Sequence, residues 1–172
     1  INSLKFSLGH PKWGTLDGQY ELLDHYTYFR NIAPQTITTR FGLFTPKKEE
    51  ELIVAPAQYE GTIQYLKLRF SQQLDFWKFS LTNTAQYQQV NHNGGTDDFK
   101  PLNVPEWNLR SSFVFSSQLF NRALYLQTGL TAQYFSKYFA DRYSAHLGEF
   151  AAQNHTEIGA FPRLDFFINA KI

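Results

Sequence analysis

Histidine is the first residue type to test for metal binding or acid-base chemistry in this chain. No two histidines have the i, i+2 or i, i+4 spacing with a neighbouring carboxylate that a zinc site requires. Four of the five lie in segments that we expect to be loops or turns. The set is His10, His25, His92, His146 and His155. We therefore predict no metal site and no cofactor.

Serine is the second candidate, because a serine beside a histidine could act as a nucleophile. The chain lacks a Gly-x-Ser-x-Gly turn, which would present such a serine. Its clustered serines are instead two adjacent pairs in a predicted strand, at Ser111, Ser112, Ser116 and Ser117. They are more typical of a small polar lining, and we predict that the protein is not an enzyme.

Lysine and arginine recur on the polar side of alternating segments, with Asp165 as the main opposing charge there and most carboxylates in loops. Rings of cations in a pore lower the barrier for anions. If these segments line water, they predict a mild anion preference. Alternatively, the cations pair with carboxylates on other strands, or they only brace the wall.

The elements that would hold these side chains are best defined between Trp107 and Tyr134. Apolar residues occupy alternate positions from Trp107 to Leu119, and the alternation returns in the opposite phase from Leu124 after Phe120, Asn121 and Arg122. Period two indicates strands, because successive side chains point to opposite faces. A tight turn between two such runs predicts a β-hairpin.

Eight strands of this kind are expected. They begin near Leu4, Gln19, Ile37, Thr62, Trp77, Trp107, Leu124 and Leu164. The two central strands exceed the usual 5–6 residues and reach the roughly 9–11 that a tilted strand needs to cross a bilayer. A soluble sandwich also alternates, so alternation does not show which face is wet.

The connections are expected to alternate in length. Short turns are predicted near Pro34, Asp75 and Asn121, and long connections near Gly14, Glu50, Gly95 and Gly148. The long extracellular loops are placed at residues 45–60, 91–106 and 136–160. Short turns on one side and long loops on the other are typical of outer-membrane barrels. In that arrangement the first, third, fifth and seventh strands run outward.

Composition limits the alternatives. Aromatic residues make up 17% of the 172 residues, which suits the interfacial girdles of a transmembrane barrel and also an aromatic-rich soluble binding module. No stretch approaches the roughly 20 apolar residues of a membrane helix. A net charge of +1 argues against a nucleic-acid partner. Cysteine is absent, so disulfide and thiolate chemistry are excluded.

The second half also resembles a known family. The segment PEWNLRSSFVFSSQLFNRALYLQTGLTAQYFSKYFADRY, from Pro105 to Tyr143, and the segment LGEFAAQNHTEIGAFPRLDFFINAKI, which ends the chain, are similar to β-barrel porins of Bacteroidetes. The resemblance covers about the last 70 residues. It includes the loop residues Phe150, Gln153 and Asn154 and the Gly159 to Pro162 step. It implies a diffusion channel in the outer membrane of a Gram-negative cell.

The interpretation is an all-β, antiparallel, up-and-down transmembrane barrel. Residues 1–172 would form one incomplete segment of a larger barrel, allowing passive diffusion of small polar solutes. The predicted pore-lining residues are Lys5, Arg40, Lys67, Arg69, Lys78, Thr82, Gln86, Arg110, Gln118, Gln127, Gln133, Asp165, Asn169 and Lys171. The predicted lipid-facing residues are Leu66, Leu68, Phe70, Trp77, Phe79, Leu81, Leu109, Phe113, Phe115, Leu124, Leu126, Leu130, Leu164, Phe166 and Ile168.

The expected partners are the lipid bilayer with its lipopolysaccharide and small polar or anionic solutes. A homo-oligomer or a larger membrane complex is left open. Two other functions also fit the pattern. One is a soluble or surface β-sandwich that binds glycans through its aromatic residues. The other is a barrel that serves as a structural subunit of a membrane complex without transporting anything.

Overall fold

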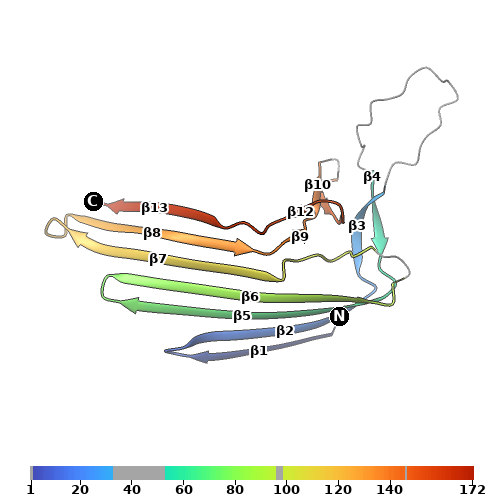
Figure 1. Cartoon of the computed structure of the whole chain (residues 1–172), viewed down its shortest axis with the longest axis horizontal. Helices are drawn as coiled ribbons and strands as arrows, with labels where there is room; N and C mark the ends of the chain where they lie inside the picture. Colours follow the sequence, from blue (N-terminus) through green and yellow to red (C-terminus); the bar gives the residue numbers. More distant parts are fainter. Residues whose placement is uncertain (1, 33–52, 96–98, 146) are drawn as a thin grey trace, which may run out of the picture.

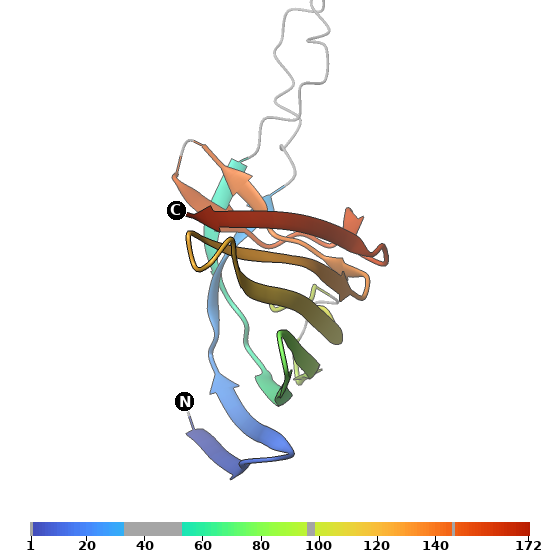
Figure 2. The ribbon, with the colours of Figure 1, turned by 90° about the vertical axis from the view of Figure 1, so that its left-hand side faces the viewer.

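The computed structural model describes residues 2–32, 53–95, 99–145 and 147–172, and within them the protein is all-β and antiparallel. Seven strands form the main sheet (Figure 1). In spatial order they are β1 (Asn2–His10), β2 (Gly14–Asp24), β5 (Thr62–Phe76), β6 (Phe79–Asn93), β7 (Trp107–Leu119), β8 (Leu124–Phe135) and β13 (Arg163–Lys171). The sheet is curved in cross-section (Figure 2). Over the described residues it does not close, and β1 and β13 are its edges.

The predicted hairpin at the centre of the second half is confirmed. Strands β7 and β8 pair from Asn108 opposite Phe135 to Leu119 opposite Leu124. Phe120, Asn121 and Arg122 all have positive φ, at 53°, 52° and 73°. Three successive left-handed residues reverse the chain within four positions, which holds the two strands in register. Across the described residues, no helix has the length and apolar content to span a membrane.

The first half differs from the expectation. The connection near Gly14 is a tight turn between His10 and Gly14, and β2 begins there instead of at Gln19. The predicted second strand ends at Asp24, where His25 with φ 54° breaks the extended backbone. The chain then forms β3 (Thr27–Ile32).

Strand β3 pairs with β4 (Ile53–Gln58) in a separate hairpin. Residues 53–58, which the sequence placed in a loop, are therefore a strand. The expected strand from Ile37 to Leu43, the short turn near Pro34 and the remainder of the 45–60 loop before residue 53 lie outside the described residues. The main sheet has seven strands within the described residues.

The connections are sorted by side, as the sequence predicted (Figure 1). Three short turns, at residues 11–13, 77–78 and 120–123, lie at one end of the sheet. The described parts of the three long connections lie at the other end, namely residues 25–32 with 53–61, 94–95 with 99–106, and 136–145 with 147–162. Because the turn at residue 12 is short, β1 runs toward the short-turn end, opposite to the predicted direction. Strands β6 and β8 run toward the long connections, as expected.

The strands are staggered in one direction. Thr15 is the second residue of β2, directly after the first short turn, and it pairs with Ser71. Ser71 lies five residues before Phe76, where β5 ends and the second short turn begins. Phe79 pairs with Phe115, four residues before Leu119. Each short turn is thus displaced along the sheet by four residues from the one before. A cumulative stagger of this kind tilts strands against the axis of a barrel.

Buried side chains lie mainly at the long-connection end. The last long connection forms two small sheets, β9 (Tyr138–Phe139) with β12 (Glu157–Ile158) and β10 (Arg142–Ser144) with β11 (Glu149–Ala151). The buried apolar residues here include Tyr59, Ile63, Ala151 and Ala152. Ala152 donates from its backbone N–H to Phe29 in β3. The connections therefore pack on one another, whereas a single sheet layer has no core of its own.

Candidate functional site

One face of the main sheet is mostly apolar, with a polar cross-strand row at Gln72, Asn83 and Ser111. Residues that are opposite across a ladder share a face. The register aligns Leu81 with Phe113, Phe113 with Leu130, and Leu130 with Phe166. Leu81 is half-buried, and the other three side chains are exposed, with Leu130 at 54% and Phe166 at 65%. An exposed apolar face of this extent requires a partner, which in a soluble monomer would be another layer of the protein.

Every residue predicted to face lipid lies on this apolar face except Trp77. Trp77 is in the two-residue turn between β5 and β6, has φ 54° and is 86% exposed. The predicted fifth strand therefore begins at Phe79. Sequence parity alone placed Trp77 in the strand, because it is apolar and has the same parity as Phe79 and Leu81.

The opposite face is polar and carries the candidate site. Lys5 pairs with Gln19, and Gln19 with Lys67. In the next row Ser7 pairs with Asp17, and Asp17 with Arg69. All predicted pore-lining residues in the main sheet share this face. Arg40 lies outside the described residues, and Lys78 lies in the β5–β6 turn with its Nζ 5.0 Å from the Trp77 ring centre.

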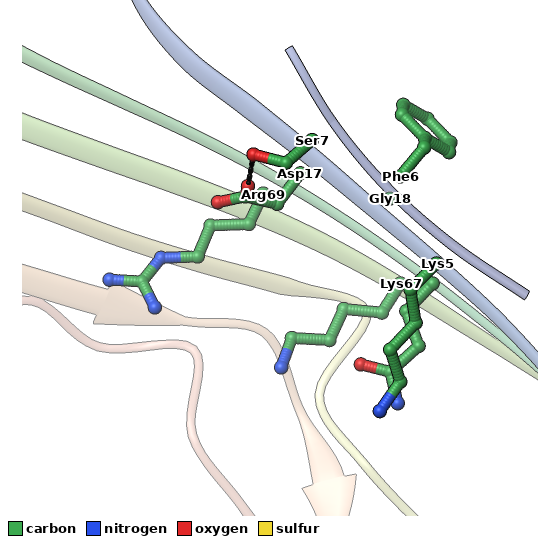
Figure 3. Close-up of a pocket in the computed structure, with 8 residues that line it drawn as sticks. Lys5, Phe6, Ser7, Asp17, Gly18, Lys67 and Arg69 are labelled. Carbon is green, nitrogen blue, oxygen red and sulfur yellow. Dashed lines mark hydrogen bonds between the residues drawn. The ribbon is translucent and has the colours of Figure 1, made fainter. Parts of the chain in front are cut away.

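A cation cluster stands on the polar face near the β1 edge, formed by Lys5, Lys67 and Arg69. It borders a depression of about 390 Å³ that Ser7, Asp17 and Gln19 also line. Figure 3 shows the three cationic side chains extending from one side of the sheet and the Phe6 ring from the other. Sequence analysis missed Asp17, because it placed the start of this strand, β2, at Gln19, and it placed Gln19 in the strand without assigning it to the lining.

The carboxylates near the cluster are bound by neutral donors. Ser7 Oγ donates to Asp17 Oδ1 over 2.6 Å, and Gln19 Nε2 donates to Glu21 Oε1 over 2.6 Å. Within the described part of the chain, neither carboxylate forms an ion pair within 4 Å of a cluster cation. The cations are therefore not neutralised by contact.

At the other edge of the sheet, residues of the polar face form an ion pair and hydrogen bonds with one another. Arg163 Nε lies 3.1 Å from Asp165 Oδ2, and Arg163 Nη2 donates to Gln133 over 3.1 Å. Asp165, expected to be the main charge opposing the pore cations, is thus bound by Arg163. The sequence offered the signal, since Arg163 and Asp165 share a parity, but the strand was started one residue too late.

The long connections contact the polar face at its outer end, which we call the mouth. Ile63, on the polar face by register, is fully buried. Gln88 Nε2 donates to the Pro105 carbonyl over 3.0 Å, and Tyr65 Oη donates to Gln88 Oε1 over 2.6 Å. The Tyr59 ring meets His92 edge-on at 5.8 Å. The connections therefore cover the end of the polar face.

Gln153 stabilises the last long connection, between β8 and β13, through side-chain hydrogen bonds. Its side chain is buried, with Nε2 donating to the carbonyls of Ala140 and Thr156 and Oε1 accepting from the backbone N–H groups of His155 and Thr156. One amide thus satisfies four backbone groups, and this saturation holds the connection in a fixed conformation.

Aromatic residues join the first two connections. Tyr28 stacks on Phe99 at 5.6 Å, and the Arg30 guanidinium lies 4.3 Å from the Phe99 ring centre. Burial raises the pKa of the nearby Asp141 carboxyl above its ordinary value. Burial, and secondly the charge of Asp141, raise the pKa of the Tyr26 phenol. At the mouth the surroundings therefore penalise the charged form of each group relative to the same group in water.

No group of three or more metal-ligating side chains occurs within the described ranges. His92 lies in β6, and this corrects the expectation that nearly all histidines lie in loops. His10 ends β1 and His25 lies in the bend after β2. His146 is outside the described residues. The site offers hydrogen bonds and charge.

A family model described as "Putative porin" matches residues 1–172. The chain belongs to this porin family. The match covers the whole chain, whereas the sequence resemblance was limited to about the last 70 residues. Searches of curated proteins and of solved structures gave no significant match.

In porins, aromatic residues border the apolar band at both membrane interfaces, and aromatic residues also lie at the two ends of the apolar face here. At the short-turn end Phe76, Trp77 and Phe79 lie together, with ring centres 5.8 Å apart for Phe76 and Phe79. At the other end Tyr87 and Trp107 are 5.0 Å apart. Trp77 and Tyr87 are ten residues apart. At the usual strand rise and tilt they span about 25 Å, the height of the apolar band in outer-membrane barrels.

Proposed function

We propose that the protein is a wall segment of an outer-membrane β-barrel porin in a Gram-negative bacterium. Its apolar face would contact lipid, with lipopolysaccharide in the outer leaflet, and its polar face would line a water-filled lumen. Small polar solutes would diffuse through the lumen passively. No covalent step takes part, and no cofactor is required.

The observation that carries this proposal is the division of one long, staggered sheet into an exposed apolar face and a polar face. The strands of 15 residues in β5 and β6 exceed the length needed to cross a bilayer at a tilt. The connections are short at one end and long at the other. A lipid partner explains both the exposed Leu and Phe side chains and the aromatic ends of the band.

The cations of the polar face support a mild anion preference. Among the residues that the structure describes, no carboxylate forms an ion pair with Lys5, Lys67 or Arg69, whereas Asp165 is bound by Arg163. The potential in such a lumen would be positive near the cluster, which lowers the barrier for anions and raises it for cations.

The soluble β-sandwich is disfavoured, because across the described residues no second sheet packs on the apolar face. A barrel that serves as a structural subunit of a membrane complex would share the same two faces, and it remains the second candidate. A homo-oligomer is compatible with either function.

Transport separates the two membrane functions. We expect liposomes that contain the full-length protein to swell in isotonic solutions of small sugars, at rates that fall as the sugar becomes larger. In a planar bilayer with a KCl gradient, the reversal potential should have the sign of an anion-selective channel. A cation-selective potential would refute the anion preference. Liposomes that hold the folded protein in their membrane and still do not swell would favour the structural subunit.

A further inference from the structure

We propose that the cation cluster of Lys5, Lys67 and Arg69 is a binding subsite for a multivalent oxyanion, such as a phosphorylated or polycarboxylated solute. The proposal rests on the proposed function, because it places the subsite on the lumen side of the wall.

Geometry brings the three cations together. Lys5 and Lys67 are in one cross-strand row with Gln19 between them, so their backbones are about 10 Å apart. Arg69 follows Lys67 by two residues on the same face, about 7 Å along the strand. The side chains extend to the same side of the sheet around the depression of about 390 Å³ (Figure 3).

The cluster is not explained as a structural ion-pair network. Like charges close together on one face destabilise a sheet unless opposite charges neutralise them. Asp17 is opposite Arg69 in the register, but it accepts from Ser7 and has no ion pair with Arg69. Glu21 is held by Gln19. The three cations, with two carboxylates nearby, leave local positive charge for a ligand.

The arrangement favours a ligand with several negative oxygens. A single chloride can contact one of these spaced cations at a time, whereas a di- or trivalent oxyanion can bridge two or three of them. Arginine adds a planar fork that matches carboxylate and phosphate geometry, and Gln19 can donate to a further oxygen. The spacing of the three cations therefore favours multivalent oxyanions over monovalent anions.

Free solutes are favoured over lipid phosphates as the source of the oxyanion. Lys67 and Arg69 lie on either side of Leu68, which pairs with Tyr87, so they are level with the aromatic residues at the mouth end of the apolar band. Lipid phosphates would lie on the opposite, lipid-facing side of the sheet. The ligand would therefore reach the subsite through the lumen.

Calorimetric titration of the full-length protein in detergent with inorganic tripolyphosphate tests the subsite without requiring transport. We expect Lys67→Gln and Arg69→Gln each to weaken binding about tenfold, as for loss of a charge-assisted hydrogen bond. Lys67→Arg should retain binding, and Asp17→Asn should strengthen it. The matched control is Lys12→Gln, which removes one positive charge from the exposed β1–β2 turn. It should change the affinity less than about twofold, since an exposed, distant charge is screened.

The proposal is overturned if tripolyphosphate does not bind, or if Lys12→Gln weakens binding as much as Lys67→Gln. Folding of each variant is checked by the heat-dependent shift in gel mobility of a folded barrel. Block of the chloride current by tripolyphosphate in planar bilayers then separates the two proposals. Binding without any conductance would refute the porin and leave the subsite. Conductance without binding would refute the subsite and leave the porin.

Discussion

Leu130→Arg tests whether the apolar face meets lipid. Leu130 lies in the middle of β8, is 54% exposed, and has Phe113 and Phe166 on either side across the sheet. On a water-facing surface, a substitution at so exposed a site would change stability by about 0.5 kcal/mol or less. At the middle of a bilayer, arginine on the lipid face of a barrel costs about 2–4 kcal/mol. The two environments therefore differ by at least about 1.5 kcal/mol.

The control is Gln127→Arg, three residues earlier in the same strand and on the polar face. It adds the same side chain and charge, but toward the lumen, so we expect a change below about 1 kcal/mol. The assay is equilibrium unfolding of the full-length protein in vesicles by guanidinium, followed by tryptophan fluorescence. The three tryptophans of the chain report on both ends of the band. Equal effects of the two variants, or an effect of Leu130→Arg below about 0.5 kcal/mol, would refute the assignment of the faces.

Three further predictions concern the mouth and the wall. Gln153→Ala should lower the stability of the last connection by about 2–4 kcal/mol, because it leaves buried backbone groups unpaired; hydrogen exchange there should speed up while β7 is unaffected. The raised pKa of Asp141 means that its contribution to the stability of the mouth is fully present below its unfolded pKa and is lost as pH rises through the folded value. Asp141→Asn should abolish that pH dependence in the same exchange measurement. Gly129→Leu should prevent folding of the β7–β8 hairpin, because a Cβ at Gly129 would lie 2.5 Å from the Phe113 carbonyl and 2.9 Å from the Phe167 ring; circular dichroism would show the loss of β structure.

The faces of the strands were predictable from sequence because alternation is a local property. Leu66, Leu68 and Phe70 share a parity that no distant contact has to supply, and the structure keeps it. The turns were predictable where the alternation changes phase, as at Asn121. The phase also changes between β5 and β6, but Trp77 is apolar and has the parity of Phe79, so the turn was placed too early, near Asp75, and Trp77 was assigned to the strand.

The first half was less predictable, since its organisation depends on long-range pairing. The stretch from His10 to Gly18 contains turn residues throughout, and only the pairing of β2 with β5 shows that Thr15 and Asp17 are in a strand. Likewise β4 contains Pro56 and follows a charge run, so its pairing with β3 had no local signal. The cation cluster is a product of the same register, because Lys5 and Lys67 come from strands that are adjacent only after β2 is placed between them.

The distribution of burial connects the fold with its proposed environment. The described part of the main sheet is one layer, and its buried side chains gather at the mouth, where the connections pack on Ile63 and Ala151. Along the rest of the described sheet the leucine and phenylalanine side chains contact one another across neighbouring strands, as Phe79 stacks on Phe113, but no second layer covers them. Hydrophobic burial is nevertheless the main favourable term in folding. The polar face cannot supply hydrophobic burial, because its side chains hydrogen-bond one another or remain exposed. An apolar solvent would supply this burial. In a bilayer the exposed leucines and phenylalanines are removed from water without a second layer of protein. On this argument the sheet folds stably only in the presence of lipid or detergent, while the mouth connections hold their conformation through their own core.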